Sequence, residues 1–209
     1  MVSVVKGENS QNTQNSQHSQ HSQEINAEAR VKKVRENLDR IKPFQLQFVQ
    51  QVYTDNELDI EESGEILFKD EHHLKWTYLK PNFKVFILQD DHYKFYDEEN
   101  EQITIGKIKD HGQQWLWQLF FSEDFLRYSY TKGSEKKKIF IKKESTEEPL
   151  DIEISLNNDY LPVQVIQQDP NTNTRMIFYF KDYKEKIIIA GDAFELNVPK
   201  NVEIIEESE

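Results

Sequence analysis

The chain has 209 residues, of which 36% are hydrophobic and 31% charged, and its formal net charge is −12 at pH 7. This length suits one domain with a substantial core, and the acidic excess argues against binding to nucleic-acid phosphates or anionic lipid surfaces. The sequence contains no cysteine, which excludes disulfide scaffolds, thiolate zinc sites, cysteine nucleophiles and a lipidated N-terminal cysteine. No stretch approaches the ~20 apolar residues that a membrane-spanning helix needs.

The first part of the chain changes character at residue 24. Residues 1–23 end in a long run of Gln, Asn, Ser and His, and a segment with nothing apolar to bury cannot offset its ordering entropy, so it is predicted to be a disordered tether. Residues 24–42 carry apolar side chains at three- to four-residue spacing, which predicts an amphipathic helix that Pro43 ends. We expect this helix to cover one opening of a sheet.

The rest of the chain, residues 24–209, is predicted to be a single mainly β domain. Short runs that alternate apolar with polar residues begin at Phe44 and are separated by turn residues, with a turn-rich gap at residues 55–63. About eleven antiparallel strands in one domain predict a barrel or a strongly curved sheet. Residues 112–125 break the alternation with aromatic and aliphatic residues at helical spacing, which predicts a second helix across the concave face.

No motif of a catalytic, cofactor or metal site is present. The sequence has no Gly-rich phosphate loop, no G-x-S-x-G, no H-E-x-x-H and no calcium loop. His72 and His73 are adjacent in a predicted strand, so they point to opposite faces and do not form a good metal-ligand pair. We therefore expect no enzymatic activity, no metal and no cofactor, and an esterase or lipid-modifying enzyme ranks last because no nucleophile–base pair is found.

The inner face of the predicted sheet is unusually apolar. In each of the first three predicted strands, large apolar residues recur at every second position, as do Phe44, Leu46 and Phe48 in the first. Such a face either fills its own interior, as an ordinary core does, or encloses an apolar cavity.

Several runs together carry a resemblance to a known family. The chain reads F-Q-L-Q-F-V-Q-Q-V, G-E-I-L-F-K, L-K-W-T-Y-L-K-P and Y-K-F-Y-D-E-E-N-E-Q, then P-L-D-I-E-I-S-L, L-P-V-Q-V-I-Q-Q-D, T-R-M-I-F-Y-F and A-F-E-L-N-V-P-K-N-V-E-I-I. In order and spacing these runs resemble the outer-membrane lipoprotein carrier protein (LolA) family over residues 28–206. The family's closing F-x-F-x-x-P-x-G-V-x-V pattern has Asn201 here in place of its glycine.

The resemblance implies an unclosed antiparallel β-barrel with α-helices over its opening. It further implies a monomeric periplasmic carrier, its signal peptide already removed, that shuttles the acyl chains of lipoproteins from the inner to the outer membrane in a hydrophobic cavity. The implied partners are acylated lipoproteins as cargo, an inner-membrane lipoprotein-releasing transporter and an outer-membrane acceptor. The residues expected to line the cavity are Phe48, Ile66, Phe68, Leu74, Trp76, Val85, Ile87, Phe95, Leu116, Leu119 and Phe120. An error of one residue in the register of a strand would place its predicted cavity-lining residues on the opposite face of the sheet.

The chain departs from the family pattern in ways that bear on function. Asp70 and Glu71 stand where the family has Arg-Pro, whose arginine latches the lid, so a latch here needs other partners. Leu74 replaces an aromatic residue of the cavity mouth, and the lack of cysteine separates the chain from the lipidated outer-membrane receptor of the same fold. The alternative function is a non-catalytic ligand-sensing or protein-interaction domain, for which we expect a filled interior.

Overall fold

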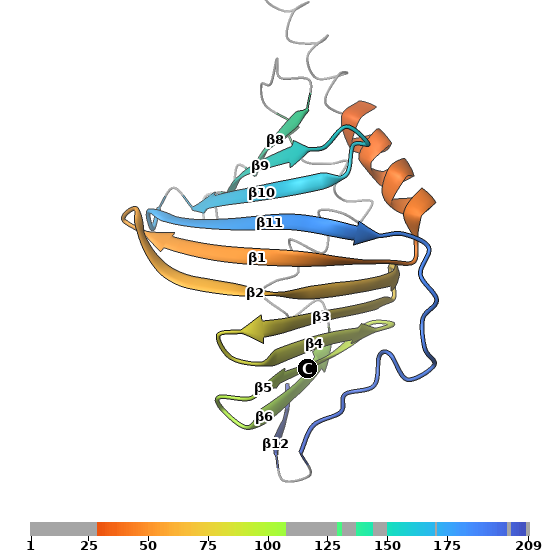
Figure 1. Cartoon of the computed structure of the whole chain (residues 1–209). Helices are drawn as coiled ribbons and strands as arrows, with labels where there is room; N and C mark the ends of the chain where they lie inside the picture. Colours follow the sequence, from red (N-terminus) through yellow and green to blue (C-terminus); the bar gives the residue numbers. More distant parts are fainter. Residues whose placement is uncertain are drawn as a thin grey trace, which may run out of the picture.

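A computed structural model describes residues 29–107, 129–130, 137–143, 150–169, 171–199 and 202–207 of the chain (Figure 1). One helix, residues 29–41, precedes the strands. The strands are β1 (Phe44–Thr54), β2 (Glu57–Asp70), β3 (His73–Lys80), β4 (Lys84–Gln89), β5 (His92–Asp97), β6 (Gln102–Lys107), β7 (Ser129–Tyr130), β8 (Lys138–Lys143), β9 (Leu150–Leu156), β10 (Pro162–Asp169), β11 (Thr174–Lys184) and β12 (Glu203–Glu206).

The described strands form one 12-stranded sheet in the order β12-β6-β5-β4-β3-β2-β1-β11-β10-β9-β8-β7. The neighbours pair antiparallel, except that β12 lies parallel to β6. The end strands β12 and β7 each have a single neighbour, so the sheet curves without closing on itself (Figure 1). The prediction of a mainly β, unclosed antiparallel barrel is confirmed.

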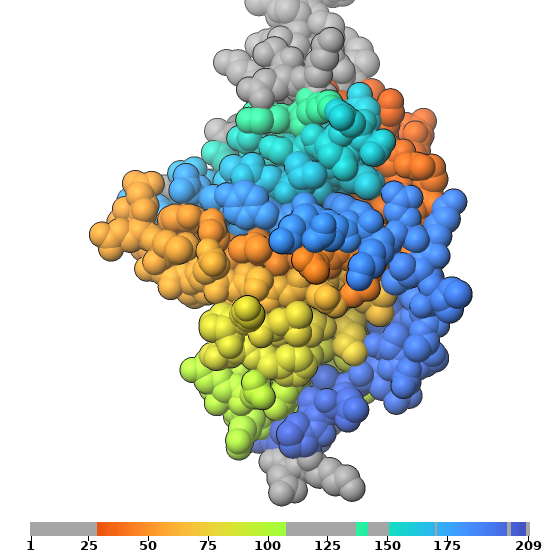
Figure 2. Space-filling model, viewed as in Figure 1, coloured from red at the N-terminus to blue at the C-terminus, as the bar shows by residue number. Residues whose placement is uncertain are grey.

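The β1–β2 hairpin is longer than the sequence predicted. Residues 55–63 were expected to be a turn-rich gap, but only Asp55 and Asn56, with φ of 50° and 68°, form the turn, and β2 already pairs with β1 from Glu57 onward. Both residue types tolerate the left-handed conformation that a two-residue hairpin turn requires. The charged residues of 57–62 concealed the strand, because this end of the hairpin projects from the body and buries little (Figure 2).

The helix packs its apolar side against the sheet. The prediction for residues 24–42 is confirmed over 29–41, where Val31, Val34, Leu38 and Ile41 are buried in the main core cluster. Polar contacts add to this, since the Asn37 side-chain amide donates to the Asp159 carbonyl at 2.8 Å. The segment 1–23 and the predicted second helix, residues 112–125, lie outside the described residues.

The two faces of the sheet are covered by different parts of the chain. We call inner the face that carries the main core cluster and the helix, and outer the opposite face. After β11 the chain forms a strap, residues 185–199, which begins with hydrogen bonds from the Lys186 and Ile187 amides to the carbonyls of Ile41 and Pro43. The strap then runs past the ends of the strands toward β12 (Figure 1) and places Phe194 on the outer face.

The expected face of two residues in β4 was wrong. Val85 and Ile87 were predicted to face inward, but they pack with Phe194 on the outer face. Phe86 and Leu88 belong instead to the inner cluster. All four consecutive residues are apolar and buried, so an alternation with period two was not available to choose between the faces.

The close approach of β2 and β3 at Gly64 leads to a first prediction. A Cβ atom at position 64 would lie 1.8 Å from the Thr77 carbonyl oxygen, which is backbone and cannot move aside without breaking the strand pairing. We expect Gly64→Ala to lower the free energy of unfolding by at least ~2 kcal/mol, as overpacking does. Urea unfolding followed by circular dichroism measures this. Gly191→Ala, where a Cβ would meet nothing within 4 Å, is the control, and equal effects would contradict the prediction.

The strap yields a second prediction, which compares two of its residues. Phe194 is 8% exposed and packs on Val85 and Ile87, whereas Ile188 is 100% exposed. Because only the first removes buried apolar contacts, we expect Phe194→Ala to cost about 2–4 kcal/mol and Ile188→Ala less than about 0.5 kcal/mol. Thermal and urea unfolding would show the difference. A strap that contributes nothing to stability would make the two variants indistinguishable.

Candidate functional site

The inner face of the sheet is a continuous apolar surface built largely of aromatic rings. The Phe48 ring meets the edges of Trp76 and Tyr78 at centroid distances of 5.0 and 5.1 Å. Trp76 continues the contact to Phe178 at 5.7 Å, and Phe178 stacks on Phe180 at 6.1 Å. These residues come from β1, β3 and β11, so the surface crosses the middle of the sheet.

Most of the residues expected to line this surface are brought together on it. Phe48, Ile66, Phe68 and Leu74 are buried members of the inner cluster. Trp76 and Phe95 are partly buried and pack against that cluster. Of the remaining expected residues, two face outward and three lie outside the described residues: Val85 and Ile87, and Leu116, Leu119 and Phe120.

Sequence reasoning missed several aromatic and aliphatic residues of the inner face, among them Phe86, Leu88, Phe178 and Phe180. Phe86 and Leu88 were missed because β4 is apolar at every position from Val85 to Leu88. Phe178 and Phe180 share one face of β11 and lie opposite Gln50 and Phe48 of β1. Their spacing of two within M-I-F-Y-F was available as a signal, but the pairing of β11 with β1 joins segments more than a hundred residues apart in sequence and was not.

At the hairpin end of the inner face, the apolar surface gives way to a polar group. The Tyr78 hydroxyl donates to the Gln50 side-chain oxygen at 3.1 Å, and the Lys84 ammonium lies 2.9 Å from a Glu62 carboxylate oxygen. Burial by itself would lower the pKa of Lys84, but the hydrogen bond and charge of Glu62 outweigh it, so the pKa of Lys84 is raised. Lys84 therefore remains charged at neutral pH.

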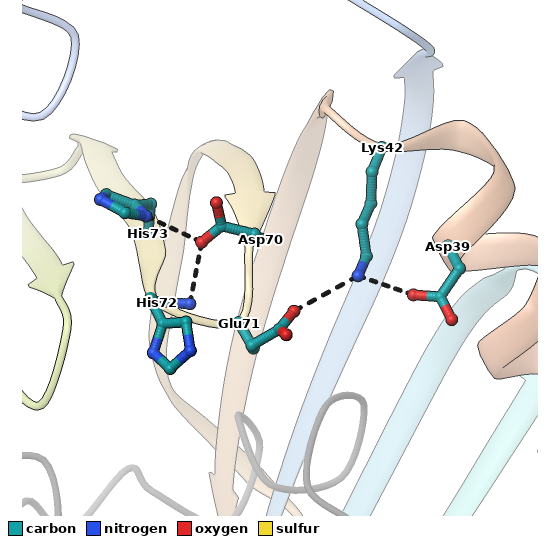
Figure 3. A network of polar contacts seen from close by, with 6 residues as sticks. All are labelled: Asp39, Lys42, Asp70, Glu71, His72 and His73. Atoms are coloured by element: carbon teal, nitrogen blue, oxygen red, sulfur yellow. Dashed lines mark hydrogen bonds and ion pairs between the residues drawn. The ribbon is translucent and has the colours of Figure 1, made fainter.

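The end of the helix is tied to the β2–β3 hairpin through Glu71, one of the two residues that stand in place of Arg-Pro (Figure 3). The Lys42 ammonium lies 2.7 Å from an Asp39 carboxylate oxygen and 3.4 Å from a Glu71 carboxylate oxygen. Burial opposes the charge of Lys42, but the hydrogen bond and charge of Asp39 and then of Glu71 prevail, so the pKa of Lys42 is raised. A backbone hydrogen bond, followed by the charge of Lys42, lowers the pKa of Glu71.

Asp70, the other residue at this position, organises the turn itself. One of its carboxylate oxygens accepts from the His72 amide at 3.0 Å and contacts the His73 ring nitrogen at 2.8 Å (Figure 3). Burial would raise the pKa of Asp70, yet the hydrogen bonds from His73 and His72 outweigh it, and the pKa is lowered. Asp70 thus holds the hairpin, while Glu71 is the residue that reaches the helix.

A hollow lies on the outer face, beside the strap. Its volume is about 420 Å³. Within it the Gln45 amide donates to Glu65 at 2.6 Å, and the Lys75 ammonium donates to the Ala193 carbonyl at 3.0 Å. The residues that line it are Gln45, Glu65, Leu67, Lys75, Thr77, Phe83, Val85, Ala193, Glu195, Leu196 and Asn197. The strap thus forms one wall of this hollow, and the bond from Lys75 to the Ala193 carbonyl joins that wall to β3.

The described part of the chain lacks two other kinds of feature. Within it, no group of three or more His, Cys, Asp or Glu side chains is placed to hold a metal ion. Nor does a helix among those residues have the length and apolar content to cross a membrane.

Comparisons with solved structures identify proteins of the same fold. An uncharacterized conserved protein from Thermus thermophilus superposes with a TM-score of 0.55 at 12% identity, over 87% of this chain and 99% of that one. A LolA superfamily protein from Nitrosomonas europaea gives 0.55 at 10% identity, over 81% and 97%. The Pseudomonas aeruginosa MucA/MucB complex gives 0.51 at 14% identity, over 82% of this chain and 61% of the chain it matches.

The comparison with protein families is more specific. No curated protein matches the sequence. The sequence pattern of one family, described as outer membrane lipoprotein carrier protein LolA, matches residues 39–197, from the end of the helix to the end of the strap. This span contains β1 to β11 and therefore nearly all of the inner face. The chain belongs to the LolA family.

Proposed function

We propose that this protein is a non-catalytic carrier that shelters the acyl chains of lipoproteins on its inner face and moves them across the periplasm, from the inner to the outer membrane. The observation that supports this most directly is the continuous aromatic surface that links Phe48, Trp76 and Phe178 under a helix. Membership of the family supports the proposed partners, which are acylated lipoproteins as cargo, a releasing transporter of the inner membrane and an outer-membrane acceptor.

The energetics of acyl chains explain why such a surface is needed. Each methylene kept from water is worth ~0.8 kcal/mol, so one long acyl chain represents on the order of 10 kcal/mol. A lipoprotein that leaves one membrane therefore cannot cross an aqueous compartment unless a protein shields its acyl chains from water. That protein must also release its cargo, which requires that the cover over its binding surface opens at a modest free-energy cost.

The attachment of the helix suits such a cover. The ion-pair partners at its C-terminal end are exposed, since Glu71 and Asp39 are 55% and 64% exposed at their side chains, and surface ion pairs of this kind are worth ~0–1 kcal/mol. Near its other end the Arg30 guanidinium donates to the Lys138 carbonyl at 2.6 Å in a partly buried bond. Four apolar side chains of the helix bear on the inner cluster. An acyl chain that binds would replace the apolar contacts that the helix makes with that cluster. The helix can then move away without exposing the apolar face of the sheet to water.

A second candidate function is a protein-interaction domain on the same fold. It is favoured by a solved neighbour, MucB of Pseudomonas aeruginosa, which is in complex with MucA. In that case the interior stays filled by the protein's own side chains, and no acyl ligand is taken up.

Displacement of a fluorescent fatty acid by a synthetic diacylated lipopeptide tests the carrier proposal. We expect saturable, one-to-one binding, with the complex visible by native mass spectrometry. Phe95→Glu, which sets a charge on the inner face, is expected to weaken binding at least about tenfold. The matched control is Tyr179→Glu, at an exposed position of β11, and it should bind as the wild type does. Absence of saturable binding by the folded wild type would refute the carrier and favour the interaction domain.

The ion pair between helix and hairpin leads to a kinetic prediction. We expect Glu71→Gln to change the free energy of unfolding by less than about 1 kcal/mol, yet to speed ligand exchange by a few-fold, because the tie to Lys42 is weakened. Since the folded-state pKa of Glu71 is lowered, its contribution is present above the ordinary pKa of a glutamate and is lost as pH falls through the folded value. Ligand exchange by the wild-type protein should therefore accelerate at acidic pH, where Glu71 becomes protonated. It should also accelerate at higher salt concentration, which screens the ion pair.

The control for this prediction is Glu36→Gln. Glu36 pairs with Lys32 at 3.9 Å within the helix itself and does not reach the sheet. Stopped-flow displacement measures the exchange rate in both variants. If Glu36→Gln accelerates exchange as much as Glu71→Gln does, the tie to the hairpin has no special role.

A further inference from the structure

Three buried side-chain polar atoms among the described residues have no hydrogen-bond partner: Trp76 Nε1, Gln167 Oε1 and Arg175 Nε. Buried polar atoms are nearly always paired in folded proteins, because an unpaired one loses its hydration without compensation. An atom that breaks this rule is a candidate for contact with a ligand. Arg175 belongs to the outer face, where its guanidinium lies 4.9 Å from the centroid of the Tyr53 ring, so it is not part of the inner surface.

The other two atoms belong to the same region of the inner face. The Trp76 ring contacts Phe178 of β11. Gln167 of β10 lies opposite Met176 of β11, which in turn lies opposite Val52 of β1. Met176 and Phe178 are successive inner-face residues of β11, so Trp76 and Gln167 approach the same short stretch of that strand from its two sides.

Their chemistry is complementary. An indole N–H can only donate, and an amide oxygen can only accept. The surroundings are apolar: Phe48 and Phe178 flank the indole, while Ile152 of β9 lies opposite Gln167 on its other side. Neither atom is bonded to the other, and a ligand group that offers one acceptor and one donor is the chemical match for the two.

We propose that Trp76 and Gln167 bind the amide linkage of an N-acylated ligand whose hydrocarbon chain lies on the inner face. The indole N–H donates to the amide carbonyl oxygen, and the amide N–H donates to Gln167 Oε1. This inference rests on the proposed binding of acyl chains and adds a preference for the linkage. An ester or a carboxylate offers the acceptor for Trp76 but no donor for Gln167, so it leaves one buried atom unpaired.

The test compares two probes that differ only at the linkage. N-lauroylglycine methyl ester contains an acyl amide, and the lauroyl ester of methyl glycolate has an oxygen in place of the N–H. Each probe displaces a fluorescent fatty acid from the full-length protein. We expect the wild type to bind the amide about tenfold more tightly than the ester, as one extra hydrogen bond to a buried acceptor allows.

Variants assign the preference to the two side chains. Gln167→Met keeps the volume of the side chain and removes the acceptor, so it should reduce the amide to the affinity of the ester and leave the ester within about twofold of wild type. Trp76→Phe removes the donor that both probes use and should weaken both by about fivefold. Arg175→Met, which removes the third unpaired atom from the outer face, should change neither probe. Thermal unfolding checks that each variant is folded.

The possible failures are distinguishable. If both probes bind the wild type equally, the amide preference is refuted while the carrier proposal stands. If Gln167→Met weakens both probes alike, Gln167 has a packing role and the inference is also refuted. If neither probe displaces the fluorescent fatty acid, because no acyl ligand binds at all, the carrier proposal fails and this inference with it.

Discussion

Burial of the apolar inner face, and of the outer face at β4, is the constraint on which the rest of the structure depends. An antiparallel sheet can leave one face in water, but it needs a cover wherever that face is apolar. β4 shows this most clearly, because Val85 and Ile87 meet the strap while Phe86 and Leu88 join the inner cluster. The strap is therefore a structural part of the domain. Because the strap covers the outer side of β4, the inner face remains available for another role.

This division suits the proposed carrier function, which requires one face to change while the other stays as it is. The strap is fixed to the outer face by Phe194 and by the bond from Lys75 to the Ala193 carbonyl. The helix bears on the inner cluster with its apolar side and touches the β2–β3 hairpin through the exposed Lys42–Glu71 pair. Exposed ion pairs contribute little to stability, so the sheet can stay folded whether or not that pair is made.

Much of the fold could be predicted from local pattern, and what could not has identifiable causes. Alternation predicted the inner face for Phe48, Ile66 and Phe68, because the buried positions of β1 and β2 recur at every second residue and fix the phase. β4 offered no phase at all, since both of its faces are buried. The start of β2 was misjudged because solvent-exposed strand residues resemble a loop in composition.

The site was less predictable than the fold, because it depends on pairing between distant segments. Phe178 faces the same surface as Phe48 and Trp76 only because β11 pairs with β1. No local sequence pattern predicts that pairing. The contact of Lys42 with Glu71 is not predicted by local pattern either. The departure from Arg-Pro at residues 70–71 was visible in the sequence, but its consequence, a tie made from the helix by a lysine to a glutamate, required the structure.

The combination of an apolar inner face with a few polar atoms bears on how such a surface could discriminate among ligands. Apolar contact is nearly indifferent to chemistry, since it depends on area and shape. Selectivity comes instead from polar atoms that are costly to leave unpaired, and the penalty is largest where water is excluded. Trp76 Nε1 and Gln167 Oε1 are such atoms. The aromatic surface would then supply the affinity for any long chain, and these two atoms would decide which linkage at the head of the chain is held best.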